Sequence, residues 1–411
     1  MSGERAPRPH VLMVVGAYYP EVAGGGLQCR TLILALRDRV DFTVLATTAT
    51  SGQPLLSMVD GVPVYRIEND LRRPFTKLRG IVQFARALWH VARHCDVFHF
   101  HGFTQRMLAL VPVARLAGRP MIEKMTSVGW DDPVSMQRRP NGGRLFRAFE
   151  QVDAFVSISP AMSKRMADAS LPAERVTLIP NGVDTARFAP VDAATRGSIR
   201  AALGLSPAAW IVTFVGFWSR EKSPGVLFQA WLQLVRRGVQ TELLFVGATS
   251  EHLEADAALV ADVKARAKAE GVTDRLRLVE HTLEVPRYLQ ASDAFVLPSS
   301  REGLPNALLE AMATGLPCVC TRLPGVTDWV IQDGRNGSLV PADDVSALAA
   351  ALDALHSDPE RARAMGARAR ETMREQFAIE RVADRYFDLY SRLLGRPADE
   401  RRPAAAKVGA A

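Results

Sequence analysis

The most informative absence in this sequence is that of a long apolar run. No stretch approaches the roughly 18 uninterrupted apolar residues that a membrane-spanning helix needs. Residues 1–10 lead directly into an expected strand and lack the apolar centre of a signal peptide. We therefore expect the protein to stay in the cytoplasm.

Cysteine is also scarce, with four residues in a chain of 411. Cys318 and Cys320 lie two apart on one expected strand, with neither a second cysteine pair nor a histidine cluster near them in the sequence. This pattern is typical of buried small hydrophobic side chains rather than of metal ligands. The sequence therefore predicts no disulfide framework and no metal site.

What the chain does contain is the composition of a globular protein, with 48% hydrophobic and 23% charged residues. Its length suffices for two α/β domains. Apolar stretches typical of buried parallel strands, such as residues 11–15 and 210–215, alternate with helical patterns. The sequence predicts an α/β fold of two doubly wound parallel sheets, whose ligands bind beyond the carboxyl ends of the strands.

The formal net charge of +7 favours anionic partners without choosing among them. Basic residues and aromatic rings are interleaved over residues 72–93, and a second basic group follows at residues 138–147. A basic helix with aromatics is typical of a surface that rests on an anionic membrane. It is equally typical of an ordinary helix whose rings lie in the core. The residues are Arg72, Arg73, Lys77, Arg79, Arg86, Arg93, Arg138, Arg139, Arg144 and Arg147, with Phe75, Phe84 and Trp89.

The stretch of residues 293–321 is predicted to form a strand, a loop and a helix. An apolar run ends at a Pro-Ser-Ser break, and strong helix formers follow until a Gly-Leu-Pro sequence. Glu302 then lies in the loop at the carboxyl end of the strand, and Glu310 lies inside the helix. Pro305 suits the first helical turn, where a missing N–H costs nothing.

The start of this helix is expected to bind an anion. The first N–H groups of a helix have no intrahelical acceptor, so those of Leu304, Asn306 and Ala307 and the positive end of the helix dipole form a seat for phosphate. Carboxylates do not attract phosphate, but they accept hydrogen bonds from hydroxyl groups of the same ligand. A nucleotide sugar, with a sugar and a ribose joined by pyrophosphate, has this layout. The alternative is that Glu302 and Glu310 are ordinary surface residues.

The segment EGLPNALLEAMATGLPCV, which follows a strand ending in LPS, resembles the donor-binding motif of glycosyltransferase family 4, the retaining nucleotide-sugar transferases of GT-B fold. The resemblance implies that Glu302 contacts the transferred sugar and Glu310 the ribose. It also implies donor-binding roles for Gly303, Leu304, Pro305 and Asn306.

The segment after residues 210–215 resembles a second family motif, in which an arginine and a lysine hold the diphosphate. Gly216 and Lys222 keep their positions, whereas Phe217 replaces the arginine and Ser223 a glycine. Arg220 is close enough in sequence to supply the missing charge. By resemblance, Lys222, Arg220 and Glu302 carry the catalytic roles.

The first half resembles the family more loosely. Gly24, Gly25 and Gly26 follow the first strand as the family's glycine-rich loop does, which implies contact with the donor phosphates. The segment DVFHFHG places His99 and His101 on one face of a strand end, opposite two phenylalanines, as hydrogen-bonding residues at the edge of the site.

The segment after residues 121–124 departs from the family. Val128 stands where many members have a histidine near the transferred sugar. The residues expected to fill that space on the acceptor or sugar side are Lys124, Thr126, Asp131 and Asp132, although the two aspartates are also typical of a helix cap or turn.

We therefore expect an acceptor-side Rossmann-like domain over residues 1–189, a donor-binding one over 190–376, a returning helix over 377–394 and a disordered tail over 395–411. The resemblance implies a retaining, metal-independent transfer from a UDP- or GDP-sugar to a glycan or lipid-linked acceptor, in polysaccharide or glycolipid biosynthesis. The alternatives are a GT-B epimerase or phosphorylase, or a non-catalytic protein that binds an anionic surface. No motif indicates nucleic-acid binding.

Overall fold

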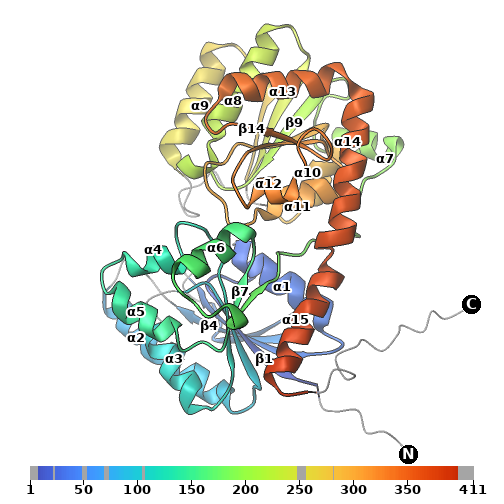
Figure 1. The fold of residues 1–411 in the computed structure, drawn as a ribbon. Coiled ribbons are helices and arrows are strands. Elements are labelled where there is room, and N and C mark those ends of the chain that lie inside the picture. Colours follow the sequence, from blue (N-terminus) through green and yellow to red (C-terminus); the bar gives the residue numbers. More distant parts are fainter. Residues whose placement is uncertain are drawn as a thin grey trace, which may run out of the picture. The chain divides into compact units, whose positions relative to one another are not determined.

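The computed structural model describes residues 8–21, 24–48, 53–68, 74–103, 107–247, 256–280 and 282–396. The chain divides into two compact units (Figure 1): unit 1 comprises Met1–Gly182 and Ile379–Ala411, and unit 2 comprises Val183–Ala378. The boundaries therefore differ from those expected, because residues 183–189 and 377–378 belong to unit 2. Most of the tail expected to be disordered, residues 397–411, lies outside the described residues, as do Arg72 and Arg73.

Unit 1 is built on an eight-stranded sheet with the order β3-β4-β2-β1-β5-β6-β7-β8. Its neighbouring strands pair in parallel except for the edge strand β3, which runs antiparallel to β4. The sequence analysis missed β3, a four-residue edge strand with no buried residue. The strands are β1 His10–Val15, β2 Asp41–Thr48, β3 Leu56–Val59, β4 Val62–Glu68, β5 Val97–His101, β6 Met121–Lys124, β7 Ala154–Ser157 and β8 Val176–Leu178.

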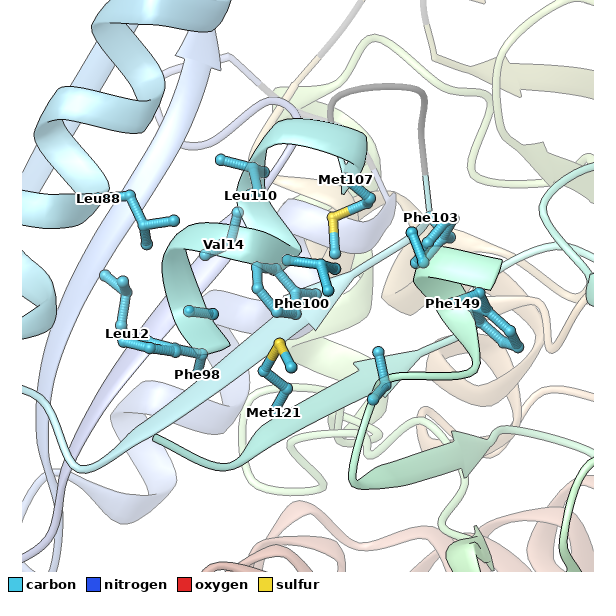
Figure 2. Close-up of a cluster of buried hydrophobic side chains, with 14 of the residues drawn as sticks. Leu12, Val14, Leu88, Phe98, Phe100, Phe103, Met107, Leu110, Met121 and Phe149 are labelled. Carbon is cyan, nitrogen blue, oxygen red and sulfur yellow. The ribbon is translucent and has the colours of Figure 1, made fainter. Parts of the chain in front are cut away.

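Helices cover both faces of this sheet, because its central strands are apolar on both sides. One core cluster joins the sheet to α2, α3, α5 and α6, and Phe98 and Phe100 of β5 lie within it (Figure 2). A second cluster joins the opposite face to α1 and α15, which contact each other (Figure 1). The helices are α1 Gly24–Leu36, α2 Pro74–Ala92, α3 Met107–Leu116, α4 Pro133–Gln137, α5 Gly142–Phe149, α6 Pro160–Asp168 and α15 Ile379–Leu393.

Unit 2 is a six-stranded parallel sheet with the order β11-β10-β9-β12-β13-β14. The strands are β9 Trp210–Val215, β10 Thr241–Val246, β11 Leu276–Val279, β12 Ala294–Leu297, β13 Cys318–Thr321 and β14 Ser338–Val340. Cys318 and Cys320 are buried free thiols in β13, as expected. The helices are α7 Ala193–Ala202, α8 Pro224–Arg236, α9 Ala257–Ala269, α10 Val285–Ala291, α11 Asn306–Ala313, α12 Thr327–Val330, α13 Val345–Ser357 and α14 Pro359–Thr372.

Alternate residues of the unit 2 strands enter different core clusters. Val212 and Phe214 of β9 pack with α8 and α13 on one face, whereas Ile211 packs on the other face with α7 and α10. The two sheets, each with helices on both faces, confirm the predicted doubly wound α/β architecture.

Candidate active site

The switch point of the unit 2 sheet lies between the neighbouring strands β9 and β12. Strands β10 and β11 follow on one side of β9, and β13 and β14 follow on the other side of β12. Connections that diverge in this way leave room for a ligand beyond the carboxyl ends of the two strands. Binding residues are therefore expected in the loops after β9 and β12. These loops contain Lys222 and Glu302, which belong to the two motifs described in the sequence.

An ion pair joins these two loops. The Lys222 ammonium lies 2.6 Å from a carboxylate oxygen of Glu302, although the residues are 80 positions apart. Glu302 is only 9% exposed, and the lysine side chain is partly exposed. The backbone N–H of Ser300 also donates to the Glu221 carbonyl at 2.8 Å, and Arg301 pairs with the Glu221 carboxylate. These contacts hold the 3-10 turn Arg220–Lys222 against the loop that follows β12.

Glu310 lies in α11, beyond the same loop. The helix begins at Asn306. Pro305 is its N-cap residue and has an extended conformation, whereas the sequence suggested that Pro305 lies in the first turn of the helix. Desolvation raises the pKa of Glu310 to about 7, and the positive charge of Arg187 only partly opposes the effect. Within the described part of the chain, the Glu310 carboxylate has no hydrogen-bond or ion-pair partner.

The backbone after β9 is constrained by glycine. Gly216 has a φ of +154°, and a Cβ on the neighbouring Gly247 (φ +147°) would lie 2.1 Å from the Gly216 carbonyl oxygen. Ser223, which stands where the family has glycine, adopts a left-handed conformation with φ 48°. That conformation favours glycine, so Ser223 holds a backbone geometry that glycine would adopt more easily.

Arg220 differs from Lys222 in its surroundings. Its side chain is 87% exposed, and its guanidinium lies 3.5 Å from Asp256. The structure therefore brings Lys222 and Glu302 into contact but leaves Arg220 extended into solvent beside an acidic partner.

The histidines of β5 are more deeply buried than expected. His99 has no exposed surface, and its Nδ1 lies 2.9 Å from the Tyr390 hydroxyl of α15. Its ring centroid is 4.4 Å from that of His101, which is 7% exposed. The placement of His99 at the edge of the site is wrong, because α15 covers this face of the sheet. Burial lowers the pKa of both imidazoles, the positive charge of Lys124 acts in the same direction on both, and His99 lowers the pKa of His101 further.

The two aspartates after β6 have structural roles. Asp132 caps α4 by accepting from the Ser135 N–H at 3.0 Å, and Arg165 pairs with it at 2.8 Å. Burial acts to raise the pKa of Asp132, but bonds from Ser135, Arg165 and Gly129 outweigh it and lower the pKa.

Asp131 accepts from the backbone and hydroxyl of Thr126 and from the Ser127 N–H at 2.6 Å. Desolvation raises its pKa in spite of these bonds. Thr126 and Asp131 thus fix the loop that follows β6. Val128 is partly buried and packs against the core cluster that includes residues of α3 and α5.

The three glycines after β1 are also placed differently from the prediction. Gly24–Gly26 form the first turn of α1 rather than the end of a loop. A Cβ on Gly26 would lie 2.3 Å from the Ala17 carbonyl oxygen, so this glycine permits close packing of the helix on the loop that follows β1.

Contacts from distant segments could not be found by sequence reasoning. Tyr386 and Tyr390, four residues apart on α15, face the histidines of β5, with Tyr386 at a ring distance of 5.3 Å from His99. Arg187, near the start of unit 2, acts on Glu310. In the sequence, the only feature that indicates this contact is the spacing of the two tyrosines, because residues i and i+4 lie on the same face of a helix.

Among the residues that the structure describes, no group of three or more His, Cys, Asp or Glu side chains is arranged to hold a metal ion. In the same part of the chain, none of the helices is both long enough and apolar enough to cross a membrane.

Two Rossmann-like units, each with a sheet covered by helices on both faces, form the architecture of the GT-B fold. The family model for glycosyl transferases group 1 matches residues 209–358, and that for glycosyltransferase family 4 matches residues 22–187. The chain therefore belongs to glycosyltransferase family 4 and is a glycosyltransferase.

Known relatives agree with this assignment. The GDP-mannose-dependent alpha-(1-6)-phosphatidylinositol monomannoside mannosyltransferase of Mycolicibacterium smegmatis is 31% identical over 64% of this chain and 68% of its own length. Alpha-maltose-1-phosphate synthase of the same species is 27% identical over 93% of this chain and 99% of the relative. The structure of Anabaena HepE in complex with UDP and glucose has a TM-score of 0.74 at 18% identity, covering 93% of this chain and 99% of HepE.

Proposed function

We propose that this glycosyltransferase moves a sugar from a nucleotide-sugar donor to a hydroxyl of a glycan or lipid-linked acceptor, with retention of anomeric configuration. The observation that carries the proposal is the contact of Lys222 with Glu302, in the loop that leads into α11, the helix that contains Glu310. This arrangement offers a cation and helix N–H groups for a diphosphate, with a hydrogen-bond acceptor on either side.

Lys222 offsets the charge that grows on the leaving diphosphate, which is electrostatic stabilisation of the departing group. In the ligand-free protein this ammonium pairs with Glu302. An ammonium has three donors, so it can keep that bond while it also contacts a phosphate oxygen. The exposed Arg220 is free to turn from Asp256 toward the diphosphate, because a surface ion pair contributes at most about 1 kcal/mol.

Glu310 accepts hydrogen bonds from the ribose hydroxyls in this proposal. Its raised pKa, and the absence of a donor to its carboxylate among the residues that the structure describes, suit a group that accepts hydrogen bonds from a ligand. Glu302 contacts the transferred sugar, while Gly216 and residues 303–306 contact the donor through their backbone. In unit 1, Gly24–Gly26 contact the phosphates, and His101, Lys124 and Thr126 lie on the acceptor or sugar side.

No side chain is assigned as a nucleophile, because the family resemblance implies attack by the acceptor on the face that the leaving group vacates. No metal ion is assigned either, since Lys222 and the helix start supply positive charge; a transfer rate unchanged by EDTA would support this. The donor is proposed to be a UDP- or GDP-sugar. One relative is named for GDP-mannose, and HepE was solved with UDP.

The location is proposed to be the cytoplasmic face of a membrane, where unit 1 rests on anionic lipid. Trp130 is 62% exposed, and the Arg139 guanidinium lies 4.9 Å from its ring. Residues 133–149 contain four arginines, of which Arg138, Arg144 and Arg147 are exposed and Arg139 is half-buried, and none of them forms an ion pair within the described part of the chain. On α2, Phe84 is buried and Trp89 is 46% exposed, so that helix has features of both expected alternatives.

The test of the donor assignment is thermal unfolding against UDP-, GDP-, ADP- and CMP-sugars, for the wild type and for Glu310→Gln. A ligand that binds only the folded state raises the unfolding midpoint. We expect one nucleotide class to stabilise the wild type and not the variant. Release of that nucleotide in the presence of acceptor extracts then tests transfer, and a lack of stabilisation by every donor would refute the proposal.

A further inference from the structure

Lys124 is a buried cation that has no counter-charge among the residues that the structure describes. It ends β6, is 3% exposed, and has no hydrogen bond or ion pair to any residue that the structure describes. Its closest ring contact is Tyr386, whose centroid lies 5.8 Å from the ammonium. Burying an unpaired charge costs folding free energy, so a buried lysine of this kind is expected to have a binding partner.

The groups around Lys124 are hydrogen-bond donors that also lack partners. His101 is directly opposite Lys124 in the register of β5 and β6, and both of its ring nitrogens are buried without a partner. The Tyr386 hydroxyl and the Nε2 of His99 are likewise buried and unpartnered in the described structure. An ammonium, an imidazole N–H and a phenol O–H therefore share one face of the sheet.

Among the residues that the structure describes, no carboxylate forms an ion pair with Lys124. Glu123 precedes Lys124, but successive residues of a strand point to opposite faces of the sheet. The ionisable group that acts on Lys124 is the Cys29 thiol of α1, and burial raises the pKa of this thiol to about 12, so it is neutral at physiological pH. Buried water would satisfy the hydrogen bonds but would leave the charge uncompensated, whereas an oxyanion accepts from all three donors and carries the opposite charge.

We propose that Lys124, His101 and Tyr386 form an oxyanion site in unit 1 that binds a phosphate group of the acceptor. The site itself follows from the unpartnered donors. Its assignment to the acceptor rests on the proposed function, in which unit 1 is the acceptor side. The acceptor is accordingly a phosphate ester, such as a sugar phosphate or a lipid-linked phosphate, rather than a neutral glycan.

The test is calorimetric titration of the full chain with inorganic phosphate, glycerol 1-phosphate and glycerol, at constant ionic strength. All proteins carry Lys222→Met, so that the donor site does not contribute. We expect both phosphates to bind and glycerol not to bind. Adding Lys124→Met should weaken phosphate binding at least tenfold, whereas Lys164→Met, which removes an exposed lysine of the same unit, should leave it unchanged.

Equal phosphate binding with and without Lys124 would overturn the site. Tyr386→Phe keeps the ring and its packing, so a several-fold loss in this variant supports the site even if Lys124→Met folds poorly. Inorganic phosphate binding tenfold more tightly than the ester would overturn the acceptor assignment. Thermal stabilisation by donor nucleotides is measured separately: its absence in the wild type refutes the proposed function and the acceptor assignment, but not the oxyanion site.

Discussion

The substitution Glu310→Gln separates binding from stability, because it should change them in opposite directions. Desolvation raises the pKa of Glu310 from its ordinary 4.5 to about 7. The folded protein therefore holds a proton on this group between pH 4.5 and 7 that the unfolded chain has lost. Stability falls as the pH rises through this window, and above pH 7 the full cost of the buried carboxylate remains.

The size of that cost follows from the two pKa values. Their difference corresponds to about 3 kcal/mol, and partial exposure to solvent reduces it to about 1–2 kcal/mol. Glutamine keeps the shape of the side chain but cannot ionise. The ligand-free variant should therefore be about 1–2 kcal/mol more stable than the wild type at pH 8, and the difference should vanish near pH 4.

Binding should respond in the other direction. At a donor concentration about 100 times its dissociation constant, the wild type gains about 2.7 kcal/mol of stability. Glutamine is a poorer acceptor for ribose hydroxyls than a carboxylate, so most of this gain should be lost in the variant.

The assay is urea unfolding between pH 4 and 9, with and without the donor, on the wild type and Glu310→Gln. Glu371→Gln, which changes an exposed glutamate of the same unit, is the matched control and should follow the wild type throughout. The reasoning is refuted if Glu310→Gln keeps the wild-type slope between pH 4.5 and 7, or if the donor stabilises it as strongly as the wild type.

Four further predictions concern other groups. Lys222→Met leaves the Glu302 carboxylate buried without its partner, so the variant should lose about 1–3 kcal/mol of unfolding free energy and should no longer bind the donor. Adding Glu302→Gln should restore the stability measured by urea unfolding but should not restore donor binding. The pKa of Lys124 is about 8 instead of 10.5, so wild-type stability should rise by about 3 kcal/mol between pH 8 and 10.5, a rise that Lys124→Met should abolish. Asp132→Ala removes the cap of α4 and its ion pair and should cost about 2 kcal/mol in thermal unfolding, with donor stabilisation unchanged. Removing the four arginines should weaken binding to anionic vesicles by about 1 kcal/mol per charge, as measured by co-sedimentation. The substitutions are Arg138→Gln, Arg139→Gln, Arg144→Gln and Arg147→Gln. Co-sedimentation equal to that of the wild type would contradict the membrane surface.

The sequence determined the architecture and the donor motifs because both depend on local order. Alternating apolar strands and amphipathic helices predict doubly wound sheets, and the Pro-Ser-Ser break before Glu302 fixes a strand, a loop and a helix. The spacing of Glu302 and Glu310 placed one in the loop and the other in the helix, as observed. The resemblance of these segments then gave the family.

Tertiary structure decided which polar residues are available to a ligand. His99 reads as a residue at the edge of a site, but α15 returns from the far end of the chain and buries it against Tyr386 and Tyr390. Asp132 read equally well as a cap or a ligand group, and only the position of Arg165 and α4 distinguished these roles. The burial of Lys124 without a counter-charge is likewise invisible in sequence, because desolvation and pairing depend on segments that meet only when the chain folds.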